Sequence, residues 1–123
     1  MKLGKTGIAR IIAAVAYSIK GLRFTWKNEA AFRQECLLSI VLIPIAFILG
    51  DTTTQISLLL LPIFLTLIIE LINSAIEAIV DRISSELHEL SGAAKDIGSA
   101  AVLMSLILWA VIWLSFLFEK FMN

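Results

Sequence analysis

The chain has 123 residues, of which 59% are hydrophobic and 16% are charged, and its ten basic residues balance its ten acidic ones. Soluble domains average about 45–50% apolar and about 25% charged residues, and so short a chain cannot bury such an apolar excess in a water-soluble core. The composition excludes a disordered chain, a nucleic-acid-binding domain and an ordinary soluble enzyme. It predicts a single membrane-embedded domain over residues 1–123.

The N-terminal part of the sequence predicts an amphipathic helix over about residues 6–27. Residues 1–35 contain seven of the ten basic residues but only two of the acidic ones. A basic helix with one apolar stripe is typical of a helix that lies on the inner leaflet of a membrane. Packing against other protein is the alternative. The apolar stripe consists of Ile8, Ile11, Ile12, Val15, Ile19, Leu22 and Trp26.

Three uncharged apolar runs follow, the longest of which covers the 22 residues 97–118. A helix needs about 20 mostly apolar residues to cross a bilayer core of about 30 Å. Nine of the ten Lys and Arg residues lie before the first run or in the loop between the second and third runs. The positive-inside rule therefore predicts a cytoplasmic N-terminus and a periplasmic C-terminus. The predicted spans cover about residues 30–50, 55–84 and 94–119.

Small residues recur on one stripe of the third predicted span, at Ala94, Gly98, Ala101 and Ser105. Small side chains at this spacing allow helices to approach closely in lipid. We interpret this stripe as a packing surface rather than as a chemical site.

The second predicted span carries polar residues on one face toward its end. If this helix enters lipid near Ile56, Glu70 lies about 21 Å further along, in the inner third of the bilayer core. An acidic side chain at that depth is costly and indicates a function. The residues that share this face are Glu70, Asn73, Ser74, Glu77 and Asp81.

The depth of the glutamates along this face suggests separate tasks. Glu70, where headgroups meet acyl chains, suits a general base that acts on a lipid hydroxyl. Glu77 lies about 10 Å further, in the aqueous layer, and suits Mg²⁺, which binds carboxylate and phosphate oxygens. Glu29, at the start of the first span, lies at the same level and could complete the metal site. The alternative is that Glu70 and Asn73 only bond to neighbouring helices.

The loop after the second span offers no familiar cofactor motif. His88 and Glu89 do not complete a zinc-binding HExxH pattern, because residue 92 is Gly. Lys95 could contact phosphates as a point charge, or it could be a solvated lysine at a helix end. Gly4-Lys5-Thr6 lacks the upstream glycine and strand of a P-loop. If the chain binds a nucleotide, it does so without a P-loop.

Several segments resemble the prokaryotic diacylglycerol kinase family, and the length, the number of spans and their orientation extend the resemblance to essentially the whole chain. Glu70-x-x-Asn73-Ser74-Ala75-Ile76-Glu77-x-x-Val80-Asp81 is similar to the family signature. Residues 28–35, residues 86–92 and Lys95-Asp96 match as well. Better-known members read Gly-Ser-Glu where this chain has Ser84-Ser85-Glu86, and some carry a basic residue at position 93 or 94 that is absent here.

The resemblance implies an all-α kinase of the bacterial cytoplasmic (inner) membrane, working as a homotrimeric helical bundle with active sites shared between subunits. It implies transfer of the γ-phosphoryl group of ATP, with Mg²⁺, to 1,2-diacylglycerol. Glu70 would be the catalytic base, and Glu29 and Glu77 would bind the metal. The residues implied to line the nucleotide are Arg10, Tyr17, Glu29, Glu77, Glu86, His88, Lys95 and Asp96. Those implied to border the lipid are Arg10, Ala31, Phe32, Arg33, Gln34, Glu35, Glu70, Asn73, Ser99 and Trp113.

Three other interpretations stay open. A relative of the same family phosphorylates undecaprenol, so the acceptor could be a polyprenyl alcohol. A small oligomeric channel or transporter would use Glu70 as a titrating site within the membrane, without ATP. A structural subunit would tolerate Glu70→Gln. An interior formed by three spans is small, and we expect Glu70 and Asn73 to be shielded better between protomers, which favours an oligomer.

Overall fold

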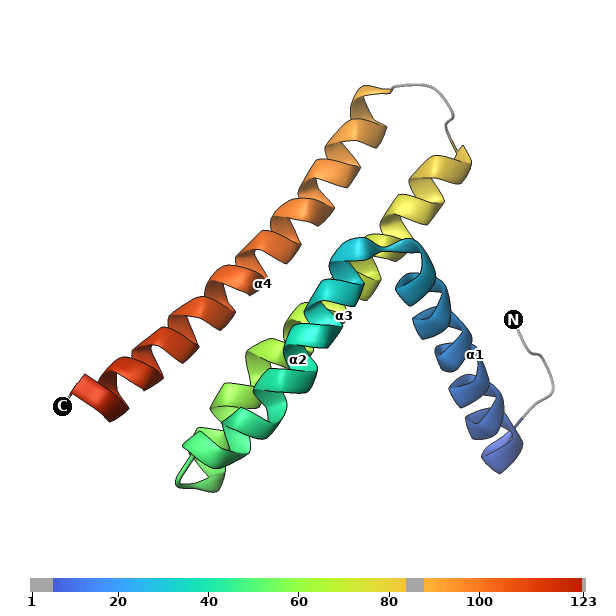
Figure 1. Ribbon diagram of the computed structural model, residues 1–123. Helices are drawn as coiled ribbons and strands as arrows, with labels where there is room; N and C mark the ends of the chain where they lie inside the picture. Colours follow the sequence, from blue (N-terminus) through green and yellow to red (C-terminus); the bar gives the residue numbers. More distant parts are fainter. Residues whose placement is uncertain (1–5, 84–87, 123) are drawn as a thin grey trace.

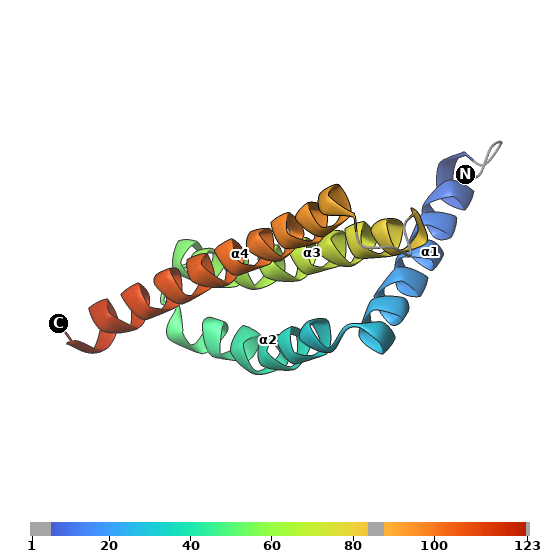
Figure 2. The same cartoon turned by 90° about the horizontal axis from the view of Figure 1, so that it is seen from above.

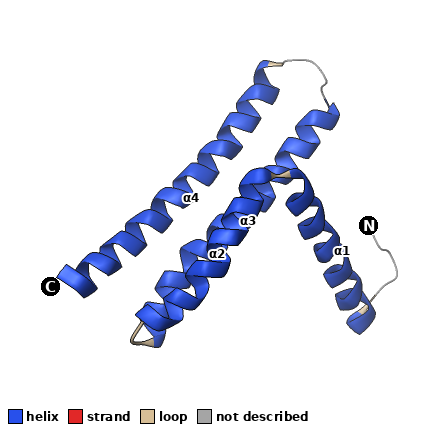
Figure 3. Cartoon of the chain, viewed as in Figure 1, coloured by secondary structure: helices blue, strands red, loops and turns tan. Residues whose placement is uncertain are grey.

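The computed structural model describes residues 6–83 and 88–122, which form four helices and no strand (Figures 1 and 3). Three of the helices are long and apolar enough to cross a membrane. The prediction of an all-helical membrane protein with three spans and one further N-terminal helix is confirmed. The last helix begins before residue 94, the predicted start. The helices are α1 (Gly7–Asn28), α2 (Ala30–Leu49), α3 (Thr53–Ile83) and α4 (Glu89–Met122).

The chain changes direction at Glu29, between α1 and α2. Glu29 has an extended backbone (φ −121°, ψ 107°), and its N–H donates to the Thr25 carbonyl oxygen at 2.9 Å. Arg33 Nη1 donates to the carbonyl oxygens of Trp26 at 2.7 Å and Lys27 at 3.2 Å. A cationic side chain at a helix C-terminus satisfies unpaired carbonyls and interacts favourably with the helix dipole. Arg33 thereby stabilises the break that positions Glu29.

A tight turn joins α2 to α3, and its own side chains cap α3. The Gln55 N–H donates to Thr52 Oγ1 at 3.1 Å, and the Asp51 N–H donates to Gln55 Oε1 at 2.7 Å. Thr followed three residues later by Gln is a typical N-terminal capping pattern. A side chain is excluded at Gly50, because a Cβ atom there would lie 2.5 Å from Cγ1 of Ile56. The turn therefore fixes how α2 and α3 pair.

α3 is the central helix, and α2 and α4 pack against it (Figures 1 and 2). Trp113 Nε1 donates to the Leu59 carbonyl oxygen at 3.0 Å in a buried position. Leu59 lies in the turn before Pro62, whose missing N–H interrupts the hydrogen bonds of α3. The indole therefore ties α4 to α3 where the helix is locally weakened. The buried apolar cluster around it consists of Ala46, Leu59, Ile63, Trp109 and Trp113.

α1 leaves the bundle at Glu29 and slants away from it (Figures 1 and 2). Thr25 is the one buried residue of this helix. The apolar stripe of α1 is open, with Ile8 76% and Ile12 64% exposed. Apolar side chains also cover the outward faces of the three spans, as at Leu114. Lipid is the solvent that accepts such surfaces, because the helices satisfy their own backbone hydrogen bonds.

Candidate active site

The polar face of α3 turns inward along the part of the helix that leads to α4. Glu70 (4% exposed), Asn73 (7%) and Ser74 (6%) are buried, and Glu77 is half-buried. Asn73 Nδ2 donates to Oε2 of Glu77 at 3.5 Å. The predicted common face is present. A single chain already buries most of Glu70 and Asn73, and the expectation that they are shielded better between protomers stays a prediction.

A second buried carboxyl group, that of Glu35 on α2, faces Glu70. Glu35 is 8% exposed, and its side chain is in hydrogen-bond contact with that of Glu70. Oε1 of Glu35 and Oε2 of Glu70 are buried and have no hydrogen-bond partner among the residues described. Buried polar atoms are nearly always paired, so each free oxygen calls for an explanation. Either the contact between the two carboxyl groups or a bound ligand accounts for these oxygens.

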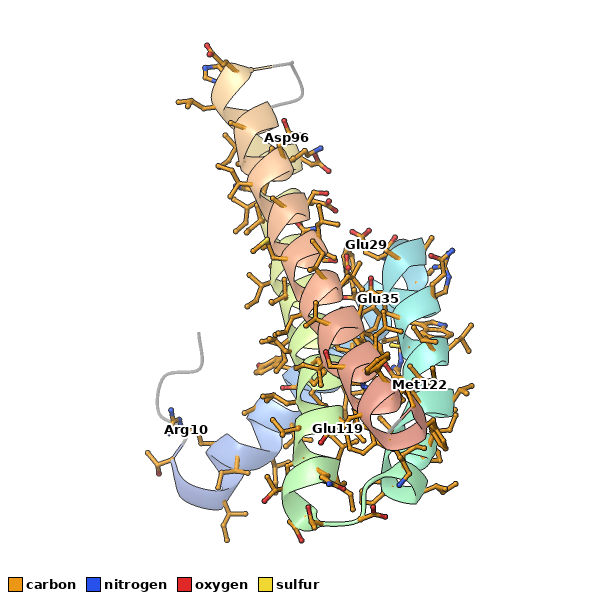
Figure 4. All side chains as sticks on the ribbon, turned by 90° about the vertical axis from the view of Figure 1, so that its left-hand side faces the viewer. Arg10, Glu29, Glu35, Asp96, Glu119 and Met122 are labelled. Atoms are coloured by element: carbon orange, nitrogen blue, oxygen red, sulfur yellow. The ribbon has the colours of Figure 1, made fainter. Side chains whose placement is uncertain are left out.

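Glu29 and Glu77 form a second carboxyl pair, closer to the C-terminal end of α3. Their side chains are in hydrogen-bond contact, and Figure 4 shows Glu29 above Glu35 near the start of α2. Mg²⁺ often binds only one or two carboxylates and completes its shell with phosphate and water oxygens. Residues 6–83 and 88–122 contain no cluster of three or more His, Cys, Asp or Glu that could hold a metal. The pair therefore fits a metal that arrives with phosphate.

Beyond the two carboxyl pairs, the facing ends of α3 and α4 are joined by an ion pair. Lys95 Nζ lies 2.6 Å from Oδ1 of Asp81. His88 accepts a hydrogen bond at Nδ1 from the Leu90 N–H at 3.1 Å, so it caps the start of α4. Glu86, which the resemblance assigns to the nucleotide, lies outside the described residues. Asp81 on α3 thus positions Lys95 of α4, which also interacts electrostatically with Glu77.

Other predicted site residues lie apart from the carboxyl pairs within one chain. Figure 4 shows Arg10 and Asp96 toward opposite ends of the molecule. Ser99 is exposed on α4. Trp113 is buried, and its bond to α3 lies about 16 Å along that helix from Glu70. Their roles in binding nucleotide or lipid stay predictions.

The residues at the start of α2 that are predicted to border the lipid differ in burial, and Tyr17, predicted to contact the nucleotide, is exposed. Phe32 is buried beside Glu35, whereas Ala31 and Gln34 are exposed. Tyr17 is exposed on α1. The structure therefore buries only part of the predicted lipid-binding stretch and leaves Tyr17 on the surface of the single chain.

An apolar cavity of about 530 Å³ lies between α1 and α3. Gly21, Phe24 and Thr25 line it from α1, and Leu71 and Ser74 line it from α3. The buried hydroxyl of Ser74 has no hydrogen-bond partner among the described residues. An apolar cavity with one free polar group, on the part of α3 that follows Glu70, is suited to part of a lipid.

Comparison with known proteins agrees with this architecture. The sequence pattern of the prokaryotic diacylglycerol kinase family matches residues 16–117. The chain is 52% identical to the diacylglycerol kinase of Escherichia coli K12 over 117 residues, which cover 94% of this chain and 95% of that protein. It is 48% identical to the diacylglycerol kinase of Pseudomonas aeruginosa PAO1 over 114 residues, or 93% of both chains. It is 47% identical to that of Haemophilus influenzae Rd over 113 residues, or 92% of this chain and 96% of the relative.

The chain belongs to the prokaryotic diacylglycerol kinase family. The resemblance found in the polar face of the second span is thereby confirmed. As a family member the protein is an enzyme, a membrane-spanning kinase of lipid metabolism, and ATP is the co-substrate that a kinase implies. Arg10 lies outside the residues that match the family pattern.

Three contacts of this kinase were not predicted from the sequence. Glu35 meets Glu70, Asp81 holds Lys95, and a Cβ atom on Gly98 would collide with Oδ1 of Asn73. The small-residue stripe indicated that α4 approaches another helix closely, but not which side chain it meets. For the Glu35 contact a single sequence carries no signal, because the two residues lie on different helices.

Proposed function

We propose that this kinase transfers the γ-phosphoryl group of ATP to the primary hydroxyl of 1,2-diacylglycerol, forming phosphatidate and ADP. The observation that carries the proposal is the buried carboxyl group of Glu70, one oxygen of which has no hydrogen-bond partner among the described residues, on the same helix face as Ser74, which lines an apolar cavity. A lipid alcohol needs a base in apolar surroundings, and a charged nucleotide needs cationic support beside it. The Glu35–Glu70 pair contains the base, and the Glu29–Glu77 pair, at the next level of α3, would hold the cation.

Glu70 acts as the general base in this proposal. Its free oxygen accepts the proton of the lipid hydroxyl while the hydroxyl oxygen bonds to the γ-phosphorus. The bond from the γ-phosphorus to the bridging oxygen breaks, and ADP leaves with that oxygen. Glu29 and Glu77 hold Mg²⁺, which supplies positive charge to the phosphates when it is bound. Lys95 contributes a further positive charge from α4.

The lipid occupies the apolar side of the same site. An acyl chain lies in the cavity between α1 and α3, and the free Ser74 hydroxyl donates to an ester carbonyl. Asn73, held toward Glu77, borders the glycerol group. A polyprenyl alcohol has no ester for Ser74 to bind, so this hydroxyl favours diacylglycerol over undecaprenol.

The active site faces the cytoplasm and is shared between subunits of a homotrimer in this proposal. The excess of basic residues before residue 36 supports the orientation. Figure 4 shows Arg10 and Asp96 toward opposite ends of the chain, and a site that combines residues of neighbouring subunits would bring two such residues to one nucleotide. Chemical crosslinking in the membrane and accessibility of single cysteines from each side test these two points.

A lipid phosphorylation assay tests the proposed function. The purified protein in micelles receives Mg²⁺ and ATP with either diacylglycerol or undecaprenol, and labelled lipid phosphate is measured. We expect turnover of diacylglycerol, and a loss of about 10²-fold or more in kcat for Glu70→Gln. Glu119→Gln, an exposed glutamate at the far end of α4 (Figure 4), is the matched control and is expected to be silent.

Two results would contradict this function. Phosphorylation of undecaprenol alone would reassign the acceptor. Inactivity on both lipids, together with ion flux through vesicles containing the protein, would replace the kinase reaction with a channel.

A further inference from the structure

The proposed base does not stand alone in the interior. Glu35 comes from α2 and Glu70 from α3, and both side chains are more than nine-tenths buried. Neither has a Lys or Arg partner among the ion pairs of the described residues, which join Lys95 to Asp81 and Lys120 to Asp51. The mechanism proposed above uses Glu70, and the predicted place of Glu35 at the border of the lipid gives it no part in the chemical step.

Two carboxyl groups in hydrogen-bond contact hold a proton between them. An ionised carboxylate only accepts hydrogen bonds, whereas a protonated carboxyl group also donates one. Two like charges buried at contact distance without a cation are strongly disfavoured, so one group keeps its proton. The pair is therefore a neutral acid that donates to an ionised partner.

The surroundings differ between the two carboxyl groups. Glu70 lies on the polar face with Asn73 and Ser74, and its Oε2 is free. Glu35 lies next to buried Phe32 and half-buried Cys36 on α2, and no polar side chain of the described residues is hydrogen-bonded to its free Oε1. Glu70 is therefore the acceptor that lies in contact with a proton on Glu35.

We propose that Glu35 is a positioning residue: it stays protonated and donates a hydrogen bond to Glu70, which keeps the base ionised and turned toward the acceptor hydroxyl. This inference rests on the proposed function, in which Glu70 is the base. Glu35 itself does not touch the reacting atoms. Its contact with Glu70 orients the carboxyl group of the base.

A pair of nearly isosteric substitutions separates donation from charge. Glu35→Gln retains a donor through its amide group, so we expect kcat within about threefold of the wild-type value. Glu35→Met fills the same space without a donor, and we expect kcat to fall by about 10- to 100-fold, as for the loss of a hydrogen bond to a charged group. The KM for ATP should change little in both variants.

Infrared spectroscopy gives a readout that does not depend on turnover. The wild-type protein should show the carbonyl band of a protonated buried carboxyl group, and Glu35→Gln should lack it. Persistence of the band in Glu35→Gln, but not in Glu70→Gln, would place the proton on Glu70 and overturn the proposal. If Glu35→Met does not fold in micelles, the infrared band and the kcat of Glu35→Gln still test whether Glu35 carries the proton.

The two proposals fail in different ways. If Glu35→Gln is as slow as Glu35→Met, an ionised Glu35 is required and the positioning role is wrong. If Glu35→Met has wild-type kcat while Glu70→Gln is inactive, only the role of Glu35 fails. If Glu70→Gln retains full kcat, the base assignment of the proposed function fails, and the infrared band still reports where the proton lies.

Discussion

The two ends of the three-span bundle treat their polar groups in opposite ways. Near the α2–α3 turn they are paired: Lys120 Nζ donates to the Leu49 carbonyl oxygen at 3.0 Å and lies 3.3 Å from Oδ2 of Asp51. Trp113 donates to the Leu59 carbonyl oxygen within the apolar core. Every one of these contacts joins α4 to the α2–α3 hairpin. This end stabilises the fold.

From Thr66 to the C-terminal end of α3, several buried polar side chains have an atom without a hydrogen-bond partner. Five buried side-chain atoms have no hydrogen-bond partner within the described part of the chain. An unpaired buried polar atom costs about 1–3 kcal/mol, so the folded chain is less stable for containing them. Such atoms persist where a substrate or a proton uses them. The contrast indicates that stability was concentrated at one end and reactivity at the other. The atoms belong to Glu35, Thr66, Glu70, Asn73 and Ser74.

Replacing Glu35 and Glu70 together by Met should have the largest effect, with opposite signs for activity and stability. Loss of the base removes about 10²-fold or more of kcat. The free energy of unfolding should rise by about 1–4 kcal/mol, because apolar side chains of similar size replace buried ionisable groups. Lipid phosphorylation and unfolding in micelles measure the two. A less stable double variant would mean that this pair supports the fold.

Glu77→Gln should weaken the binding of MgATP by about 10- to 100-fold, a size typical of losing one partner of a metal site. Titration calorimetry at several Mg²⁺ concentrations measures the affinity, and excess Mg²⁺ should recover part of it. Glu119→Gln serves again as the control. Unchanged MgATP affinity in Glu77→Gln would remove this residue from the metal site.

Gly98→Ala should destabilise the protein by about 1–3 kcal/mol, because the new methyl group collides with Oδ1 of Asn73. Gly92→Ala, also in α4, is the matched control: a Cβ atom there meets nothing within 4 Å. Thermal unfolding in micelles compares the two variants. Equal stability would show that α4 does not approach α3 as closely as the structure has it.

Trp113→Phe should lower the free energy of unfolding by about 1 kcal/mol, since it removes the hydrogen bond to Leu59 and leaves the ring in the core. The same variant tests the predicted lipid role of this residue. We expect the KM for diacylglycerol to stay at the wild-type value. A raised KM with unchanged stability would favour a contact with the lipid instead.

Lys120→Met should have the smallest effect, at most about 1 kcal/mol of stability, because the Asp51 side chain is 74% exposed and water screens the ion pair. Turnover should not change. A clear loss of lipid phosphorylation in this variant would contradict the conclusion that the end of the bundle near the α2–α3 turn serves stability alone.

Local properties of the chain were predictable from its sequence. The lengths of the apolar runs predicted three spans, and the helical period predicted that Glu70, Asn73 and Ser74 share a face. Both follow from a single helix, whose geometry repeats every few residues regardless of its neighbours. The boundary near Glu29 was predicted for the same reason. The resemblance to a known family could also be detected from the sequence, because most of its signature lies within the single segment 70–81.

Contacts between helices needed the tertiary structure. Sliding α2 by one residue along α3 moves a side chain by about 1.5 Å and turns it by about 100° around its axis, enough to turn Glu35 away from Glu70. That register depends on the Gly50 turn and on the core around Trp113, which no local period encodes. The sequence by itself determined which residues lie on each helix face. Only the packed structure decided which faces meet, and so gave the proposed base a partner.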